Sequence, residues 1–132
     1  MTRNRLKTSV KHRSGCPLAS ALDILGDKWS LLIVRGLFTG CRRYGDFLKE
    51  PEGIATNILA GRLRLLETDG VLEKFGGQPE GGAIQYRLTR KGAELLPALQ
   101  ALARWGFAHI EGRWHPLHWF MKGKPRDFYP KD

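Results

Sequence analysis

The feature that most constrains this chain is a short helical segment, a tight turn and a longer helix in the first half of the sequence. Residues 46–49 can form one or two helical turns, which end before Pro51 because proline disfavours helical geometry in the residue that precedes it. Gly53 lies in the turn, and a well-patterned helix follows over residues 55–68. Gly70 then supplies the left-handed conformation that ends many helices. This order predicts a helix-turn-helix.

The sequence period changes directly after this motif. Residues 71–75 (VLEKF) are rich in strand-forming side chains, and residues 83–88 (AIQYRL) alternate apolar and polar positions. The loop that joins them, residues 76–82, is rich in glycine. Two strands joined by a glycine-rich loop, placed after a helix-turn-helix, predict a wing.

Helices are expected on both sides of this unit. A first helix begins with Pro17, where the missing N–H costs nothing, and ends at Gly26; Asp27 then caps a second helix that is apolar on all sides and therefore belongs in the core. Thr89 is expected to cap a long last helix, which Pro97 should bend. The predicted fold is α+β, mostly α: a winged helix-turn-helix with flanking N- and C-terminal dimerisation helices.

The length of 132 residues allows one domain with one core. We expect a basic N-terminal arm at 1–14, the folded domain at 15–111, and an aromatic C-terminal tail at 112–132 for which the sequence predicts no structure. No apolar run approaches the length that crosses a bilayer, and no apolar stretch follows the basic N-terminus as in a secretory signal. The expected location is the cytoplasm.

The net charge indicates an anionic partner. Lys and Arg total 22 against 13 Asp and Glu, a formal charge of +9. Nucleic acid is the commonest partner of so basic a small protein, and an anionic membrane is the next. Charge alone leaves DNA binding, RNA binding and ribosome association open.

The helix at 55–68 carries the most specific signal. Its leucines at 59, 63 and 66 form one stripe that should face the core, and the opposite face carries Asn57, Ala60, Gly61 and Arg64. Glycine within a helix costs about 1 kcal/mol relative to alanine. A surface that enters the DNA major groove explains this cost, since asparagine can pair with adenine, and arginine with guanine or a phosphate.

Further basic residues are weaker candidates for DNA contacts. Thr56 lies at the helix start, where backbone N–H groups favour a phosphate. Arg62 lies beside the leucine stripe, where an internal ion pair with a carboxylate is as good an interpretation as a phosphate contact. The wing tip carries Glu80 and no arginine, which argues against minor-groove binding. Before the short helix and on the wing strands, the candidates for backbone contacts are Arg42, Arg43, Lys74 and Arg87.

A family resemblance covers residues 16–110. The segments CPLASALDILGDKWSLLIVRGLF, RRYGDF, GIATNILAGRLRLLETDGVL, YRLTRKGAELLPALQAL and RWG resemble the HxlR-type winged helix-turn-helix regulators in order and spacing. The resemblance implies a bacterial transcription regulator, a repressor, that binds an inverted-repeat operator in double-stranded DNA as a homodimer. The family often has serine at the position of Ala55 and a polar residue at that of Gly61. The implied recognition positions are Thr56, Asn57, Ala60, Gly61 and Arg64.

The resemblance also implies that the first helix and the last helix of each subunit pack against the partner. The apolar content of both helices agrees, because it exceeds what one small winged domain needs. The residues expected at the dimer interface are Leu18, Leu22, Leu95, Leu99, Leu102 and Trp105.

Cys16 is a candidate sensor of oxidants or electrophiles. It occupies the N-terminal cap of the first helix, where unpaired N–H groups stabilise a thiolate, and Lys11, His12 and Arg13 precede it. The alternative is a small residue buried at a helix start. Cys41, in a loop, is a less supported partner thiol, and two cysteines do not indicate a disulfide framework. The effector is thus either an oxidant or a small molecule held near the aromatic tail.

Two other functional classes, an enzyme and a module that binds RNA or protein, are the alternatives to a DNA-binding regulator. An enzyme could use Cys16 with His12, or a metal held by His115 and His118, but no acid–base arrangement and no C-x-x-C companion accompany them. We therefore predict no catalytic residue, no metal and no cofactor. A winged helix can also bind RNA or protein, although no aromatic sheet face suited to single-stranded RNA is present.

Overall fold

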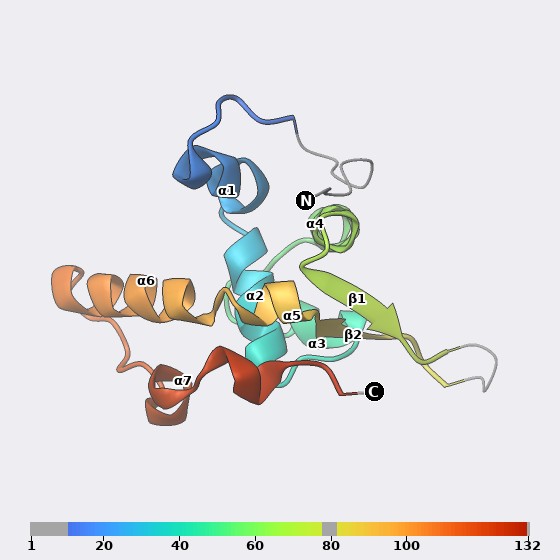
Figure 1. The fold of residues 1–132 in the computed structure, drawn as a ribbon. Coiled ribbons are helices and arrows are strands. Elements are labelled where there is room, and N and C mark those ends of the chain that lie inside the picture. The colour runs from blue at the N-terminus through green and yellow to red at the C-terminus, as the bar shows by residue number, and fades with distance from the viewer. Residues whose placement is uncertain (1–10, 78–81, 132) are drawn as a thin grey trace.

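The computed structural model describes residues 11–77 and 82–131, and Figure 1 shows their arrangement. The described part of the chain is mostly helical, with one small antiparallel sheet, as the sequence predicted. Of the expected basic arm only residues 11–14 fall within it. The elements in chain order are α1 (Pro17–Leu25), α2 (Ser30–Phe38), α3 (Tyr44–Leu48), α4 (Thr56–Thr68), β1 (Leu72–Phe75), β2 (Gln85–Leu88), α5 (Arg90–Ala93), α6 (Leu96–His109), α7 (His118–Lys122) and the 3-10 helix η1 (Pro125–Phe128).

The first helix begins and ends where proline and glycine predicted, whereas α2 begins at Ser30, three residues after the predicted cap Asp27. Pro17 opens α1 and Gly26 closes it. The carboxylate of Asp27 accepts hydrogen bonds from the backbone N–H groups of Trp29 and Ser30, each at 2.9 Å, so it caps the turn that leads into α2. α2 runs through the centre of the molecule and buries most of its residues, as expected for a core helix.

The helix-turn-helix is confirmed as α3, a turn and α4. α3 begins at Tyr44, two residues before the predicted start, because the carboxylate of Asp46 accepts from the backbone N–H groups of Arg42 and Arg43 at 2.9 Å each and so caps the helix. Gly53 in the turn and Gly70 after α4 have φ angles of 72° and 79°, the left-handed region that glycine adopts freely.

The wing is a two-stranded antiparallel sheet. Leu72 pairs with Leu88 and Phe75 with Gln85, which fixes the register. The backbone N–H of Tyr86 donates to the carbonyl of Arg42 at 2.6 Å, so the segment before α3 lies along β2. Residues 78–81, which include Glu80, lie outside the described residues.

The prediction of one long last helix bent at Pro97 is wrong in two respects. The chain forms two helices, α5 and α6, with an interruption at Glu94 and Leu95. Thr89 caps α5 as expected, accepting from Gly92 N at 3.0 Å. Pro97 does not bend a helix, because it lies in the first turn of α6, where the absence of an N–H breaks no hydrogen bond.

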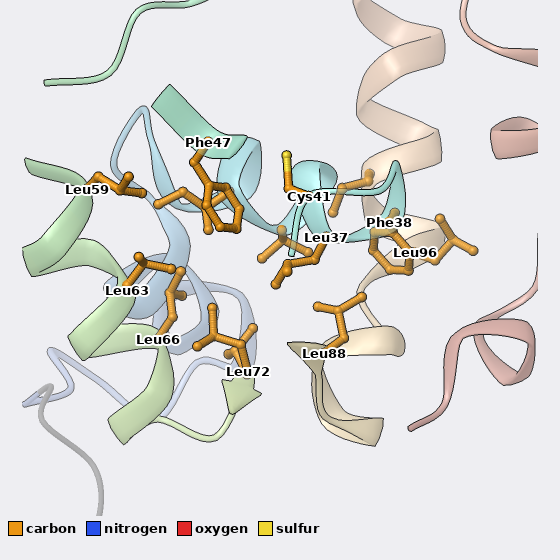
Figure 2. Packing of buried hydrophobic residues seen from close by; sticks show 14 of the residues in the cluster. Leu37, Phe38, Cys41, Phe47, Leu59, Leu63, Leu66, Leu72, Leu88 and Leu96 are labelled. Atoms are coloured by element: carbon orange, nitrogen blue, oxygen red, sulfur yellow. The ribbon is translucent and has the colours of Figure 1, made fainter. Parts of the chain in front are cut away.

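The core joins α2, the helix-turn-helix and the wing. Figure 2 shows Leu59, Leu63 and Leu66 projecting from α4 toward Phe47 and Leu37, and each of the three leucines is at most 2% exposed. This confirms the predicted leucine stripe. Because the stripe faces the core, the opposite face of α4 points outward.

The C-terminal tail, for which the sequence predicted no structure, packs against the same core. Phe120 of α7 and Phe128 of η1 contact Phe38 edge to face, with ring centroids 6.1 and 4.8 Å away. The amide nitrogen of Gln100 donates to the carbonyls of Phe120 and Gly123, each at 2.9 Å. The tail is therefore held to α6 and to the end of α2.

Most of α1 and the C-terminal part of α6 lie outside this core, whereas Leu96 and Leu99 near the start of α6 belong to it. Figure 1 shows α1 above the body and α6 extending away from it, and α1 has no buried residue. Among the residues that the structure describes, no helix is long and apolar enough to cross a membrane.

Candidate nucleic-acid interface

The outward face of α4 carries the predicted recognition residues. Asn57 and Arg64 are exposed, and neither side chain donates or accepts a hydrogen bond within the described part of the protein. Ala60 and Gly61 lie between them and are half-buried. The structure therefore brings these four residues to one surface. On it the small residues Ala60 and Gly61 separate the polar side chains of Asn57 and Arg64.

The packing of the protomer does not require a glycine at position 61. A β-carbon built on it would meet no other atom within 4 Å, and its φ angle is not in the left-handed region. The conformational cost of this glycine is therefore not explained by packing inside the protomer.

The N-terminus of α4 is open to solvent but is fixed against α3. Tyr44 donates from its hydroxyl to the carbonyl of Thr56 and contacts the Thr56 hydroxyl, at 2.5 Å in both cases. Ala55, the capping residue, supplies no side-chain acceptor, so the first N–H groups of α4 remain available to a phosphate. Sequence reasoning missed this role of Tyr44, because the two residues are far apart in the chain.

Arg62 forms an internal ion pair, which is one of the two roles that its position in the sequence allows. Its guanidinium lies 3.4 Å from the Asp27 carboxylate, which ties α4 to the turn before α2. Partial burial would raise the pKa of Asp27, but hydrogen bonds from Ser30 and Trp29 and the charge of Arg62 together lower it.

Arg42 is a structural residue rather than a free cation. It donates to the carbonyls of Leu37 and Cys41 at 3.0 and 2.8 Å, and so closes the loop between α2 and α3. Arg43 is exposed, with no side-chain partner in the described part of the chain. Of this pair, only Arg43 is free to contact a DNA backbone.

The two wing cations are paired within the protomer. Arg87 binds Glu73 at 2.7 Å, donates to the carbonyl of Lys131 at 3.2 Å and stacks over the ring of Phe75. Lys74 lies 3.9 Å from Glu67 and keeps half of its side chain exposed. Arg87 is thus committed to the fold, whereas Lys74 can still reach a phosphate.

Arg35 holds the turn of the helix-turn-helix, a role that the sequence did not reveal. From α2 it binds Glu52 at 2.7 Å and Glu50 at 3.4 Å. This pairing with Arg35 lowers the pKa of Glu52. The turn before the recognition helix is therefore fixed from α2.

The residues predicted for a dimer interface fall into two groups. Leu18 and Leu22 of α1 are 69% and 48% exposed, and Leu102 and Trp105 of α6 are 56% and 61% exposed. By contrast, Leu99 is buried in the core of its own protomer, and Leu95 is half-buried against that core. Leu95 and Leu99 therefore pack within their own protomer and need no partner subunit to cover them.

The two cysteines have opposite environments. Cys16 is exposed at the N-cap of α1, and its sulfur accepts from Ala19 N at 3.5 Å. The neighbouring cation of Arg13 is engaged by Asp23, with 2.5 Å between Nε and Oδ1. Cys41 is buried, and burial together with Glu50 and Asp46 raises its pKa to about 11.

Of the two candidate metal-binding histidines of the C-terminal segment, His115 lies against an aromatic ring. His115 packs on the ring of Phe107, with centroids 4.6 Å apart. Within residues 11–77 and 82–131, no group of three or more His, Cys, Asp or Glu side chains could hold a metal ion.

Comparison with known proteins supports a regulatory role for this geometry. The family model described as HxlR-like helix-turn-helix matches residues 24–114. An uncharacterised helix-turn-helix-type transcriptional regulator of Synechocystis sp., sll1512, is 38% identical over 96 residues, which are 73% of this chain and 71% of that protein.

Two solved structures show the same fold. That of PA1607, described as a candidate transcription factor, is 42% identical, with a TM-score of 0.71 over 79% of this chain and 73% of the other. That of the redox regulator HypR in its oxidised form is 27% identical, with a TM-score of 0.66 over 73% of this chain and 99% of the other.

Proposed function

The chain belongs to the HxlR-like helix-turn-helix family, and we propose that it is a repressor that binds an inverted-repeat operator as a homodimer. The coarser statement, that it is a helix-turn-helix transcriptional regulator, follows from the family and its relatives. Repression is the expected outcome because bound protein excludes RNA polymerase from the DNA that it covers. Such a protein would work in the bacterial cytoplasm, where the DNA is.

The outward face of α4 is the observation that carries this proposal. The core fixes α4 through its leucines, and the opposite face presents Asn57 and Arg64, whose side chains have no partner among residues 11–77 and 82–131. An asparagine can bind adenine through two hydrogen bonds, and an arginine can bind guanine in the same way. Ala60 and Gly61 between them allow the helix backbone to approach the bases closely.

The exposed leucines and tryptophan on α1 and α6 support the dimer. Leucine and tryptophan side chains that are about half exposed or more, on α1 and on the part of α6 that extends from the core, indicate a surface for a partner. A second copy with two-fold symmetry would bury the same surface on both subunits. It would also place two α4 helices on half-sites about one DNA turn apart, or a multiple of it. Sedimentation of the Trp105→Glu variant tests this, because a charge there should favour the monomer.

The test of the DNA-binding face compares Asn57→Ala and Arg64→Ala with Arg104→Ala, an exposed cation of α6 outside the proposed surface. If Asn57 binds a base, its loss should cost about 1–3 kcal/mol and relax preference at one position in each half-site. Loss of a phosphate contact at Arg64 would instead weaken all sequences and reduce the salt dependence. Unchanged operator affinity in both variants would exclude the proposed surface.

Cys16 is our candidate for an oxidant-sensitive thiol in this regulator. It is exposed at the start of α1, and modification there would change a helix of the proposed dimer interface. Binding two half-sites requires a fixed separation of the recognition helices, so a small shift of α1 would lower DNA affinity. The Cys16→Ser variant should bind DNA normally and lose any response to diamide.

A further inference from the structure

A cavity of about 350 Å³ lies between α6 and the C-terminal segment, away from the outward face of α4. Gly106 and Phe107 of α6 form one wall, and Trp114, Leu117 and Phe120 of the C-terminal segment form the other. Its volume lies within the range of small-molecule sites, about 300–1,000 Å³.

The walls of this cavity suit an aromatic ring. Trp114 and Leu117 keep 81% and 54% of their surface exposed, and Phe107 keeps 39%, so apolar area remains to be covered. His115 already stacks on Phe107 from one side. Flat apolar groups would bury this surface with favourable ring contacts.

The charge around the cavity favours an anion. None of the described residues that line it is an aspartate or a glutamate. Arg113 lies at its edge and donates from Nε to the carbonyl of Glu111 at 3.2 Å. Its two terminal amino groups have no acceptor in the part of the chain that the structure describes. Arg35 also borders the cavity, but Glu50 and Glu52 already neutralise it.

The cavity is centred on another side of α6 than the surface proposed for the dimer, although a hollow beside Leu102 shares Arg35, Ala103 and Phe120 with it. At 100° per residue, Ala103, Gly106 and Phe107 are centred about a third of a turn around α6 from Leu102 and Trp105. A partner subunit can therefore cover Leu102 and Trp105 and leave the cavity accessible.

We propose that this cavity binds a small aromatic carboxylate, with its ring between Phe107 and Trp114 and its carboxylate on Arg113. Arginine and carboxylate form paired, charge-assisted hydrogen bonds. Because Arg35 connects this cavity to the turn before α4, the bound ligand acts as an effector of DNA binding. This last step rests on the proposed function, whereas the binding site itself does not.

The experiment titrates 1-naphthoate into the full-length protein without DNA and measures binding by calorimetry. The neutral 1-naphthylmethanol is the ligand control. Arg113→Gln should weaken naphthoate binding about tenfold, and Arg104→Gln, the same change of charge on α6, should leave it unchanged. Gly106→Leu should abolish binding, because a side chain there enters the cavity. A β-carbon at Gly106 meets no atom within 4 Å, so this variant should fold, which circular dichroism checks.

Several results would overturn the proposal. They are the absence of naphthoate binding at millimolar concentration, equal affinity for the neutral control, and unchanged affinity in Arg113→Gln or Gly106→Leu. Absent binding together with a shifted monomer–dimer equilibrium in Gly106→Leu would assign the cavity to the subunit contact instead. Binding that leaves DNA affinity unaltered would support the site and exclude its effector role. Failure of the ligand-free protein to bind DNA would count against the proposed function alone.

Discussion

Replacing Gly61 by alanine should raise the stability of the protein and lower its affinity for DNA. Within the protomer the new methyl group meets no atom within 4 Å, and the backbone there is ordinary helix. The change therefore brings the full difference in helix propensity, about 1 kcal/mol. For a domain of this size this corresponds to a rise in Tm of about 3–6 °C.

The same methyl group points to the surface that we place in the major groove. Overfilling a tight contact costs about 1–3 kcal/mol, which weakens operator binding roughly 5- to 150-fold. Gly61→Leu should weaken it further while the fold persists. A substitution that raises stability but lowers DNA affinity is expected only at a residue that contacts the DNA.

Gly106→Ala is the matched control. This glycine also lies in a helix, and a β-carbon on it also meets open space, but it is distant from α4 in the chain and borders the α6 cavity. Its alanine variant should gain some stability and bind DNA as the unmodified protein does. The assays are thermal unfolding and fluorescence anisotropy with labelled operator. If Gly61→Ala and Gly61→Leu both bind operator normally, this face of α4 does not enter the groove.

Three further predictions concern the fold and the thiols. Gly92→Ala should lower the free energy of unfolding in urea by about 3 kcal/mol or more, because the new β-carbon would lie 1.9 Å from the carbonyl oxygen of Val71; a stability near that of the unmodified protein would contradict this packing. Cys16 should react with iodoacetamide in the native protein and Cys41 only after unfolding, because Cys41 is buried with its pKa raised to about 11; equal native rates would refute the assignment. The pKa of Asp27 is lowered by folding from its ordinary 3.8, so its stabilising effect is complete above that value and is lost as the pH falls through the folded pKa. Asp27→Asn should therefore destabilise the protein at pH 7 and progressively less as the pH falls below 3.8, and a loss that does not change with pH would argue against the cap.

The elements that the sequence predicted well are those whose ends carry local signals. Pro17, Gly26 and Gly70 act through their own backbone, and Asp27 accepts hydrogen bonds from N–H groups within the next three residues. Their positions in the chain were therefore sufficient to predict these helix ends. The leucine stripe of α4 has the helical period and therefore predicted which face is free.

The features that the sequence did not predict depend on partners distant in the chain. Arg87 is a basic strand residue by sequence, but Lys131 engages it from 44 positions away. Phe120 and Phe128 do not belong to an apolar pattern of helical or strand period. Their positions depend on packing against the ring of Phe38. The interruption between α5 and α6 was missed because the apolar period continues through it.

Selection of bound DNA from a random pool by the full-length protein tests the central claim most directly. We predict enrichment of one inverted repeat, with half-site centres one DNA turn or a multiple of it apart, and loss of that preference in Asn57→Ala. Enrichment of single, unpaired half-sites would contradict the dimer. No enrichment above the starting pool would contradict sequence-specific recognition by α4.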